Sequence, residues 1–198
     1  MKYSTEQKKE KAFLIGVTFK NNISYEEDLK ELSRLAETAG LVVVGQSGQY
    51  IREITPATLL GSGKLEEIKE EINSLNVDVV IVDYDLSGSQ CMNISNLFNV
   101  KVIDRMALIL DIFAQRATSN EGMLQVELAQ LKYSLPRLNA IQGTSGRFGS
   151  AGVGMRGPGE TKLEMDKRVI RVKIQKLEKE ILKIKQQRDL KRQKRNTS

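Results

Sequence analysis

The heptapeptide VDVVIVD at residues 77–83 is a short run rich in β-branched residues, which is typical of a strand buried in a sheet. Similar runs occur at residues 11–19, 41–44 and 100–104. Apolar residues at helical spacing mark residues 25–39 and 65–75, and a weaker pattern predicts a helix at residues 88–98. This alternation predicts an α/β fold, with a small, mainly parallel sheet and flanking helices.

The strand patterns stop after Asp104, and the rest of the chain is helical in pattern. Residues 106–117 and 122–141 are predicted helices, and a proline at position 136 should kink or end the second of them near Leu135. Two stripes of apolar residues alternate at spacings of four and three: Leu124, Leu128, Leu131, Leu135 and Leu138, then Ile170, Ile174, Leu177, Ile181 and Ile184. Each stripe needs a partner, so we expect a long antiparallel α-helical hairpin. Its second helix, at about 35 residues, would be roughly 50 Å long.

These patterns divide the chain into two parts. We assign residues 1–104 to an α/β subdomain and residues 105–198 to a helical hairpin subdomain. A glycine-rich loop at residues 143–159 joins the two long helices.

The loop segment, residues 143–163, reads GTSGRFGSAGVGMRGPGETKL. It holds seven of the fifteen glycines, and Arg147, Phe148 and Arg156 precede its first acidic residue, Glu160. Backbone and cations there can approach an anionic partner closely. A plain connector has a similar composition. The ordered end of the segment, a proline turn and a capping box at Thr161 and Glu164, favours a functional loop. The loop glycines are Gly143, Gly146, Gly149, Gly152, Gly154, Gly157 and Gly159.

Positive charge gathers at the C-terminal end of the chain. Residues 160–198 hold fourteen Lys and Arg against six Asp and Glu, a net charge of +8, which leaves −2 for residues 1–159. A basic arm of this kind is typical of a segment that meets phosphates, although a solvated helix face has a similar composition.

Composition excludes several kinds of functional site and several cellular locations. The chain has only one cysteine, Cys91, so it cannot form an intrachain disulfide. It has no histidine, which excludes the usual zinc ligands and every catalytic pair of a nucleophile with a histidine. We expect no metal site and no catalytic residue here. No apolar window is long enough to span a membrane, and the N-terminus does not resemble a secretory signal, so the cytoplasm is the expected location.

Residues 61–64, GSGK, resemble part of a phosphate-binding P-loop. Gly61, Gly63 and Lys64 would then contact a nucleotide. Thr58 stands where the first glycine of a P-loop belongs, however, and Leu65 replaces the hydroxyl that binds magnesium. A turn before a helix is the preferred interpretation.

Polar residues follow two of the predicted strands, where open α/β sheets place ligand sites. Asp83, Asp85 and Asp104, with Arg105 nearby, would line a polar crevice. Aspartates at these positions are more often ordinary helix N-caps, and the same caution applies to Ser87 and Ser89.

Several ordered strings make the chain resemble the N-terminal region of the HflX family of ribosome-associated GTPases. They keep the family's order and spacing from about residue 57 to residue 171. The strings are LGSGKLEE (60–67), VIDR (102–105), LILDIFAQRA (108–117), LQVELAQL (124–131), LPRL (135–138) and GPGET (157–161) with Leu163 and Glu164.

The resemblance implies an α/β subdomain and a helical hairpin that precede a GTPase domain and bind the large ribosomal subunit. Family members are implicated in splitting or rescuing ribosomes, particularly in the stress response. No complete P-loop occurs in the chain, so the GTPase domain is absent from it, and GTP and magnesium are expected only for that domain. Whether the chain is a fragment or a natural short form is left open.

The sequence therefore predicts a ribosome-binding module, expected to be a monomer, whose partners are the large subunit, its rRNA and the missing GTPase domain. Two alternatives remain: a nucleotide-binding module that uses residues 61–64, and a structural module that regulates the GTPase domain. The expected RNA contacts are Arg147, Phe148, Arg156, Lys162, Lys167, Arg168 and Arg171, with the ring stacking on a base and the cations meeting phosphates.

Overall fold

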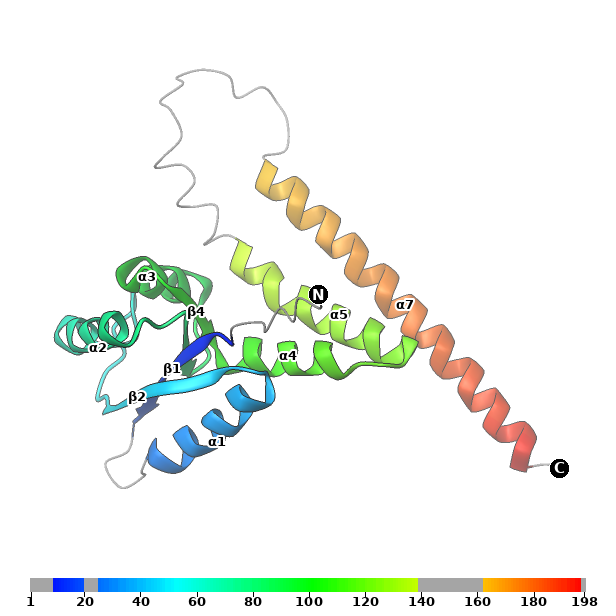
Figure 1. The fold of residues 1–198 in the computed structure, drawn as a ribbon. Coiled ribbons are helices and arrows are strands. Elements are labelled where there is room, and N and C mark those ends of the chain that lie inside the picture. The colour runs from blue at the N-terminus through cyan, green and yellow to red at the C-terminus, as the bar shows by residue number, and fades with distance from the viewer. Residues whose placement is uncertain (1–8, 20–24, 139–161, 197–198) are drawn as a thin grey trace, which may run out of the picture. The chain divides into compact units, whose positions relative to one another are not determined.

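The computed structural model describes residues 9–19, 25–138 and 162–196, which form two compact units (Figure 1). The first unit is Met1–Ile112 and the second is Phe113–Ser198. The glycine-rich loop, with Arg147, Phe148 and Arg156, lies outside the described residues.

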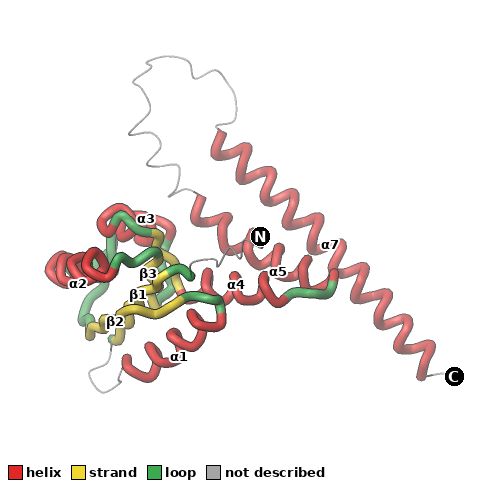
Figure 2. The backbone as a smooth tube through the Cα atoms, viewed as in Figure 1, coloured by secondary structure: helices red, strands yellow, loops and turns green. Residues whose placement is uncertain are grey.

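The first unit is built on a four-stranded sheet in which every pairing is parallel, as predicted. Its strands, shown in yellow in Figure 2, have the spatial order β2-β1-β3-β4. They are β1 (Lys11–Thr18), β2 (Val42–Tyr50), β3 (Val79–Asp83) and β4 (Lys101–Asp104). Four helices alternate with or follow them: α1 (Tyr25–Thr38), α2 (Ser62–Leu75), α3 (Gly88–Phe98) and α4 (Arg105–Arg116).

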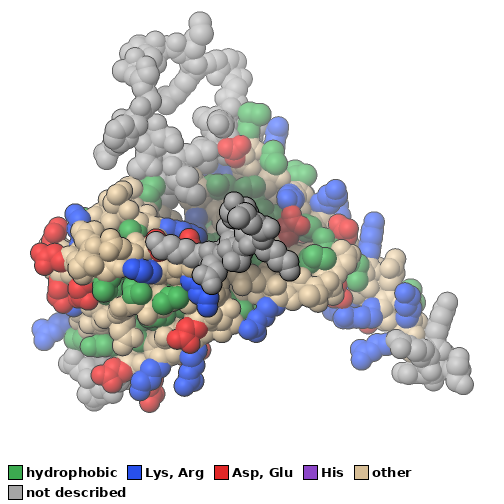
Figure 3. Space-filling view, in the orientation of Figure 1, with side chains coloured by type: hydrophobic (Ala, Val, Ile, Leu, Met, Phe, Trp, Pro, Cys, Tyr) green, Lys and Arg blue, Asp and Glu red, His purple; other side chains and the backbone are tan. Residues whose placement is uncertain are grey.

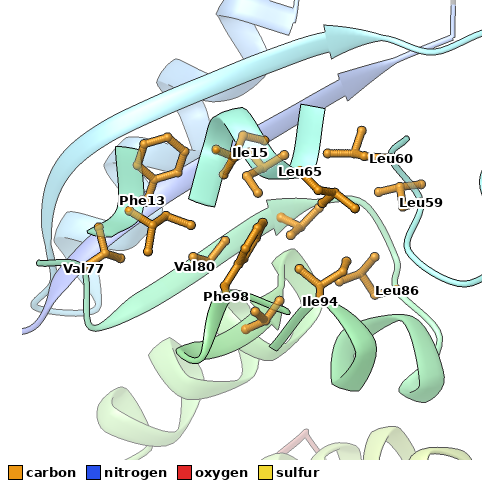
Figure 4. Packing of buried hydrophobic residues seen from close by; sticks show 14 of the residues in the cluster. Phe13, Ile15, Leu59, Leu60, Leu65, Val77, Val80, Leu86, Ile94 and Phe98 are labelled. Carbon is orange, nitrogen blue, oxygen red and sulfur yellow. The ribbon is translucent and has the colours of Figure 1, made fainter. Parts of the chain in front are cut away.

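A pair of helices covers each face of the sheet. Alternate residues of β1 point to opposite faces, so they contribute to two separate cores. Phe13 and Ile15 pack with α2 and α3 in one core, which is drawn in Figure 4. Ala12 and Leu14 pack with α1 and α4 in the other. The second core includes Leu108 and Ile112 of α4, so α4 belongs to the α/β core over most of its length.

Strand β2 is longer than the predicted strand at residues 41–44. The added residues, GQSGQY, lack an apolar pattern but pair with β1 as far as Tyr50. Glycine is needed at position 48 because the ring of Tyr25 lies so close to the backbone that a Cβ of residue 48 would collide with it. Backbone pairing, rather than side-chain burial, therefore extends the strand.

The second unit is an antiparallel pair of helices, α5 (Asn120–Ser134) and α7 (Lys162–Asn196), which lie side by side in Figures 1 and 2. α5 ends at Ser134, and a 3-10 turn, η1 (Leu135–Arg137), follows with Pro136 inside it. The predicted stop near Leu135 is confirmed. α7 has 35 residues, and the middle of its predicted apolar stripe, Ile174 and Leu177, is buried.

Candidate nucleic-acid interface

Ion pairs join the two long helices of the hairpin. Lys132 Nζ lies 2.6 Å from Glu178 Oε1, and Lys173 Nζ lies 2.6 Å from Glu127 Oε1. Near the start of α5, Arg188 Nη1 donates to Glu121 Oε2 at 3.0 Å. All three pairs contain partly exposed side chains, so each contributes at most about 1 kcal/mol. α7 also contacts η1, the turn that follows α5.

The predicted RNA contacts that fall in the described residues belong to the first turns of α7. Lys162 is the first residue of the helix, Lys167 is half-buried, and Arg168 and Arg171 are exposed. Lys167 and Arg171 are four residues apart and therefore share a helix face. Of the expected contacts, the structure thus gathers only these four into one short basic segment.

A further cation, Arg137, lies in η1 just after α5 and is not among the expected RNA contacts. The guanidinium carbon of Arg137 lies 3.6 Å from the centre of the Tyr133 ring, and Arg137 Nη1 donates to the Tyr133 carbonyl oxygen at 3.0 Å. The stacking fixes the direction of the guanidinium group. The four-residue spacing of Tyr133 and Arg137 in the sequence was the signal that could have predicted this stacking.

At the carboxyl edge of the sheet, the predicted polar cluster is an ion-paired clamp. Arg105 Nη1 donates to Asp83 Oδ1 at 3.2 Å, and Arg105 Nη2 donates to Glu31 Oε1 at 2.7 Å. Burial raises the pKa of the Asp83 carboxyl above its usual value, and the hydrogen bond from Arg105 opposes that rise. The clamp joins α1, β3 and the start of α4.

Two further polar residues at this edge, Asp104 and Ser87, act as helix caps, as the sequence interpretation favoured. Asp104 Oδ1 accepts a hydrogen bond from the Ala107 backbone N–H at 2.9 Å at the start of α4. Ser87 forms a capping box with Gln90 at the start of α3. These groups stabilise helix ends.

Residues Gly61, Gly63 and Lys64 begin α2, with Gly61 as its N-cap. Lys64 Nζ is ion-paired to Glu67 Oε1 at 2.6 Å, and its side chain is 17% exposed. It lines a pocket of about 490 Å³ beside the edge strand β2. The other lining residues are Tyr25, Glu26, Leu29, Lys30, Gln46, Ser47 and Gly48.

The residues around this segment do not fit a GTP–magnesium site. Leu65 packs in the core at 3% exposure, where a P-loop would present a hydroxyl to the metal. Thr58, in place of the first glycine, donates its hydroxyl to the Leu60 carbonyl oxygen. Within residues 9–19, 25–138 and 162–196, no group of three acidic, cysteine or histidine side chains is placed to hold a metal ion.

None of the described helices is both long enough and apolar enough to cross a membrane.

Comparison with known proteins gives consistent matches over most of the chain. Residues 26–114 match the family model of the GTP-binding GTPase N-terminal region, and residues 116–195 match that of the GTP-binding GTPase middle region. The GTPase HflX of Caldanaerobacter subterraneus is 48% identical over 187 residues, which are 94% of this chain and 43% of that protein. The GTPase HflX of Escherichia coli is 39% identical over the same shares of the two chains.

Solved structures show the same fold. A crystal structure of SsGBP in complex with GDP has a TM-score of 0.64 and 26% identity, and covers 91% of this chain and 45% of that chain. A GTP-binding protein from Sulfolobus solfataricus, also with GDP, has a TM-score of 0.61 and 26% identity, over 89% and 46% of the two chains. The present chain spans less than half the length of these relatives. It belongs to the HflX family of GTP-binding GTPases and corresponds to their N-terminal region.

Proposed function

We propose that this chain binds the large ribosomal subunit and contacts rRNA through the glycine-rich loop and the first turns of α7. The observation that carries the proposal is the antiparallel hairpin, which places Lys162, Lys167, Arg168 and Arg171 directly after the loop. Cations on a narrow helical support suit phosphate contacts, and recognition of folded RNA by shape and backbone needs no catalytic group.

In this proposal the chain is the N-terminal region of a longer cytoplasmic GTPase that splits or rescues ribosomes. GTP and magnesium belong to the GTPase domain of that longer protein, and no hydrolytic residue is assigned here. The cationic contacts are assigned to the loop and to α7, and none is assigned to the α/β unit.

The direct test is co-sedimentation of the chain with large ribosomal subunits at several salt concentrations. Replacing Arg147 and Arg156 together with alanine should weaken binding, because each lost phosphate contact removes counterion release. The slope of log affinity against log salt should flatten by somewhat under one unit for each lost contact, on a duplex-like estimate. The midpoint of thermal unfolding should stay unchanged.

The matched control removes two exposed arginines, Arg34 and Arg52, from the α/β unit. It lowers the net charge equally and should leave the affinity close to that of the unaltered chain. If the loop variant keeps both its affinity and its salt slope, the loop is a connector and this part of the proposal fails.

A second candidate function, nucleotide binding at Gly61, Gly63 and Lys64, has the pocket beside β2 in its favour. Against it, Lys64 is paired with Glu67, and Leu65 is part of the core. Replacing Lys64 with alanine should therefore leave GTP hydrolysis by the longer protein within about twofold of its original rate in the absence of ribosomes. A loss of several orders of magnitude, as expected for a P-loop lysine, would instead establish the nucleotide site.

A further inference from the structure

The structure distinguishes an inner and an outer face of α7. The inner face carries the apolar stripe against α5, with Ile174 and Leu177 buried and Ile170 and Ile181 partly buried. At 3.6 residues per turn, residues 176, 179 and 183 lie on the opposite side of the helix. All three are exposed lysines. We call Lys176, Lys179 and Lys183 the outer lysines.

The outer lysines differ from the cations that hold the hairpin together. Lys132, Lys173 and Arg188 each meet a carboxylate across the two helices. The outer lysines, in contrast, form no hydrogen bond or ion pair within the part of the chain that the structure describes. Their charge is therefore not used by the hairpin fold.

The outer face also lacks acidic residues that would offset this charge. From residue 165 to residue 194, the third of the helix circumference centred opposite the apolar stripe contains no Asp or Glu. Glu178 lies to one side and is paired with Lys132, and Glu180 lies on the other flank. Lys and Arg side chains project along α7 in Figure 3. A face of this kind favours an anionic partner.

We propose that the outer lysines bind the phosphate backbone of an RNA duplex that runs along α7, as a contact separate from the loop and the first turns of the helix. This inference rests on the proposed rRNA binding. The three charges span about 10 Å at 1.5 Å per residue, enough to meet successive phosphates. α7 has no aromatic side chain for base stacking, so the contact recognises backbone and shape, not sequence.

A protein partner would use a different part of the same face. Met165, Val169 and Val172 are exposed nearer the start of α7 and share the outer side of the helix. An apolar surface of this kind suits a protein contact. The outer lysines are charged, whereas these three residues are apolar. RNA is therefore the favoured partner of the segment from residue 176 to residue 183.

The test replaces Lys176, Lys179 and Lys183 together with glutamine, which keeps helix propensity close to that of lysine. Affinity for large subunits at about 0.1 M salt should fall about tenfold or more, and the salt slope should flatten by roughly two to three units. Binding to a protein-free RNA duplex of about 20 base pairs should weaken in the same way, because a duplex of this length is long enough to present phosphates along α7. The control variant changes Lys30, Arg34 and Lys101 of the α/β unit to glutamine and should leave both binding curves unchanged.

The outcomes separate this inference from the proposed function. If the unaltered chain fails to bind large subunits, the proposed function falls. If it binds, and the lysine variant binds with the same affinity and salt slope, the outer lysines are not a contact and only the further inference is overturned. Loss of binding in a variant with Val169 and Val172 changed to glutamine, with the lysine variant unaffected, identifies a protein partner and also overturns it.

Discussion

Replacing Phe13 with alanine should lower the free energy of unfolding of the α/β unit by about 3 to 5 kcal/mol, the usual cost of removing a fully buried aromatic side chain. Phe13 is 0% exposed and lies in the core between the sheet and the α2–α3 helix pair. It also packs against Gly45, where no Cβ fits beside its ring. Because the neighbouring strand is held by backbone hydrogen bonds, it cannot easily collapse into the cavity.

The measurement is equilibrium denaturation followed by circular dichroism, with Phe113→Ala as the control. Phe113 is the same residue type but is 57% exposed, so its replacement should cost well under 1 kcal/mol. Since Phe13 and α5–α7 belong to different compact units, the hairpin should keep its own unfolding transition in the Phe13 variant. Equal losses in the two variants would contradict the packing described here.

The elements of the α/β unit could be predicted because their burial follows from short-range patterns. β3 lies under helices on both faces, so its sequence is a continuous run of β-branched residues. β2 is an edge strand, and its residues 45–50 include Gly45, Ser47 and Gly48, which carry no burial pattern. Its true length depends on pairing with β1, a contact between distant residues that local spacing does not encode.

The candidate interface was only partly predictable, for a related reason. Composition identified α7 as basic, and the motif strings identified the loop. The apolar stripe of α7 already indicated which side of the helix meets α5, but the pairing of Lys173 with Glu127 and of Arg188 with Glu121 joins distant parts of the chain that local patterns do not connect. The grouping of Asp83 with Arg105 was expected from sequence, whereas Glu31, the third member of the clamp, comes from a distant helix and has no local signal.

The second large effect should follow from Leu177→Ala, which removes a side chain from the middle of the hairpin. Leu177 is 5% exposed and lies between α5 and α7. Its loss should destabilise the hairpin by about 2 to 5 kcal/mol if the surrounding side chains do not close the cavity. Because the two helices are joined mainly by this apolar stripe and by weak surface ion pairs, little else compensates.

The consequence for binding links the fold to the proposed function. Separation of α7 from α5 would remove the support that presents the loop and its adjoining cations, so affinity for large subunits should fall as the hairpin unfolds. The affinity should recover at lower temperature, where a larger fraction of the variant is folded, whereas loss of a direct contact would persist. Leu182→Ala is the matched control on the same helix, since Leu182 is 55% exposed and its replacement should change neither stability nor binding appreciably. If Leu177→Ala unfolds the hairpin while binding is kept in full, ribosome recognition does not depend on the hairpin, and the α/β unit must supply it.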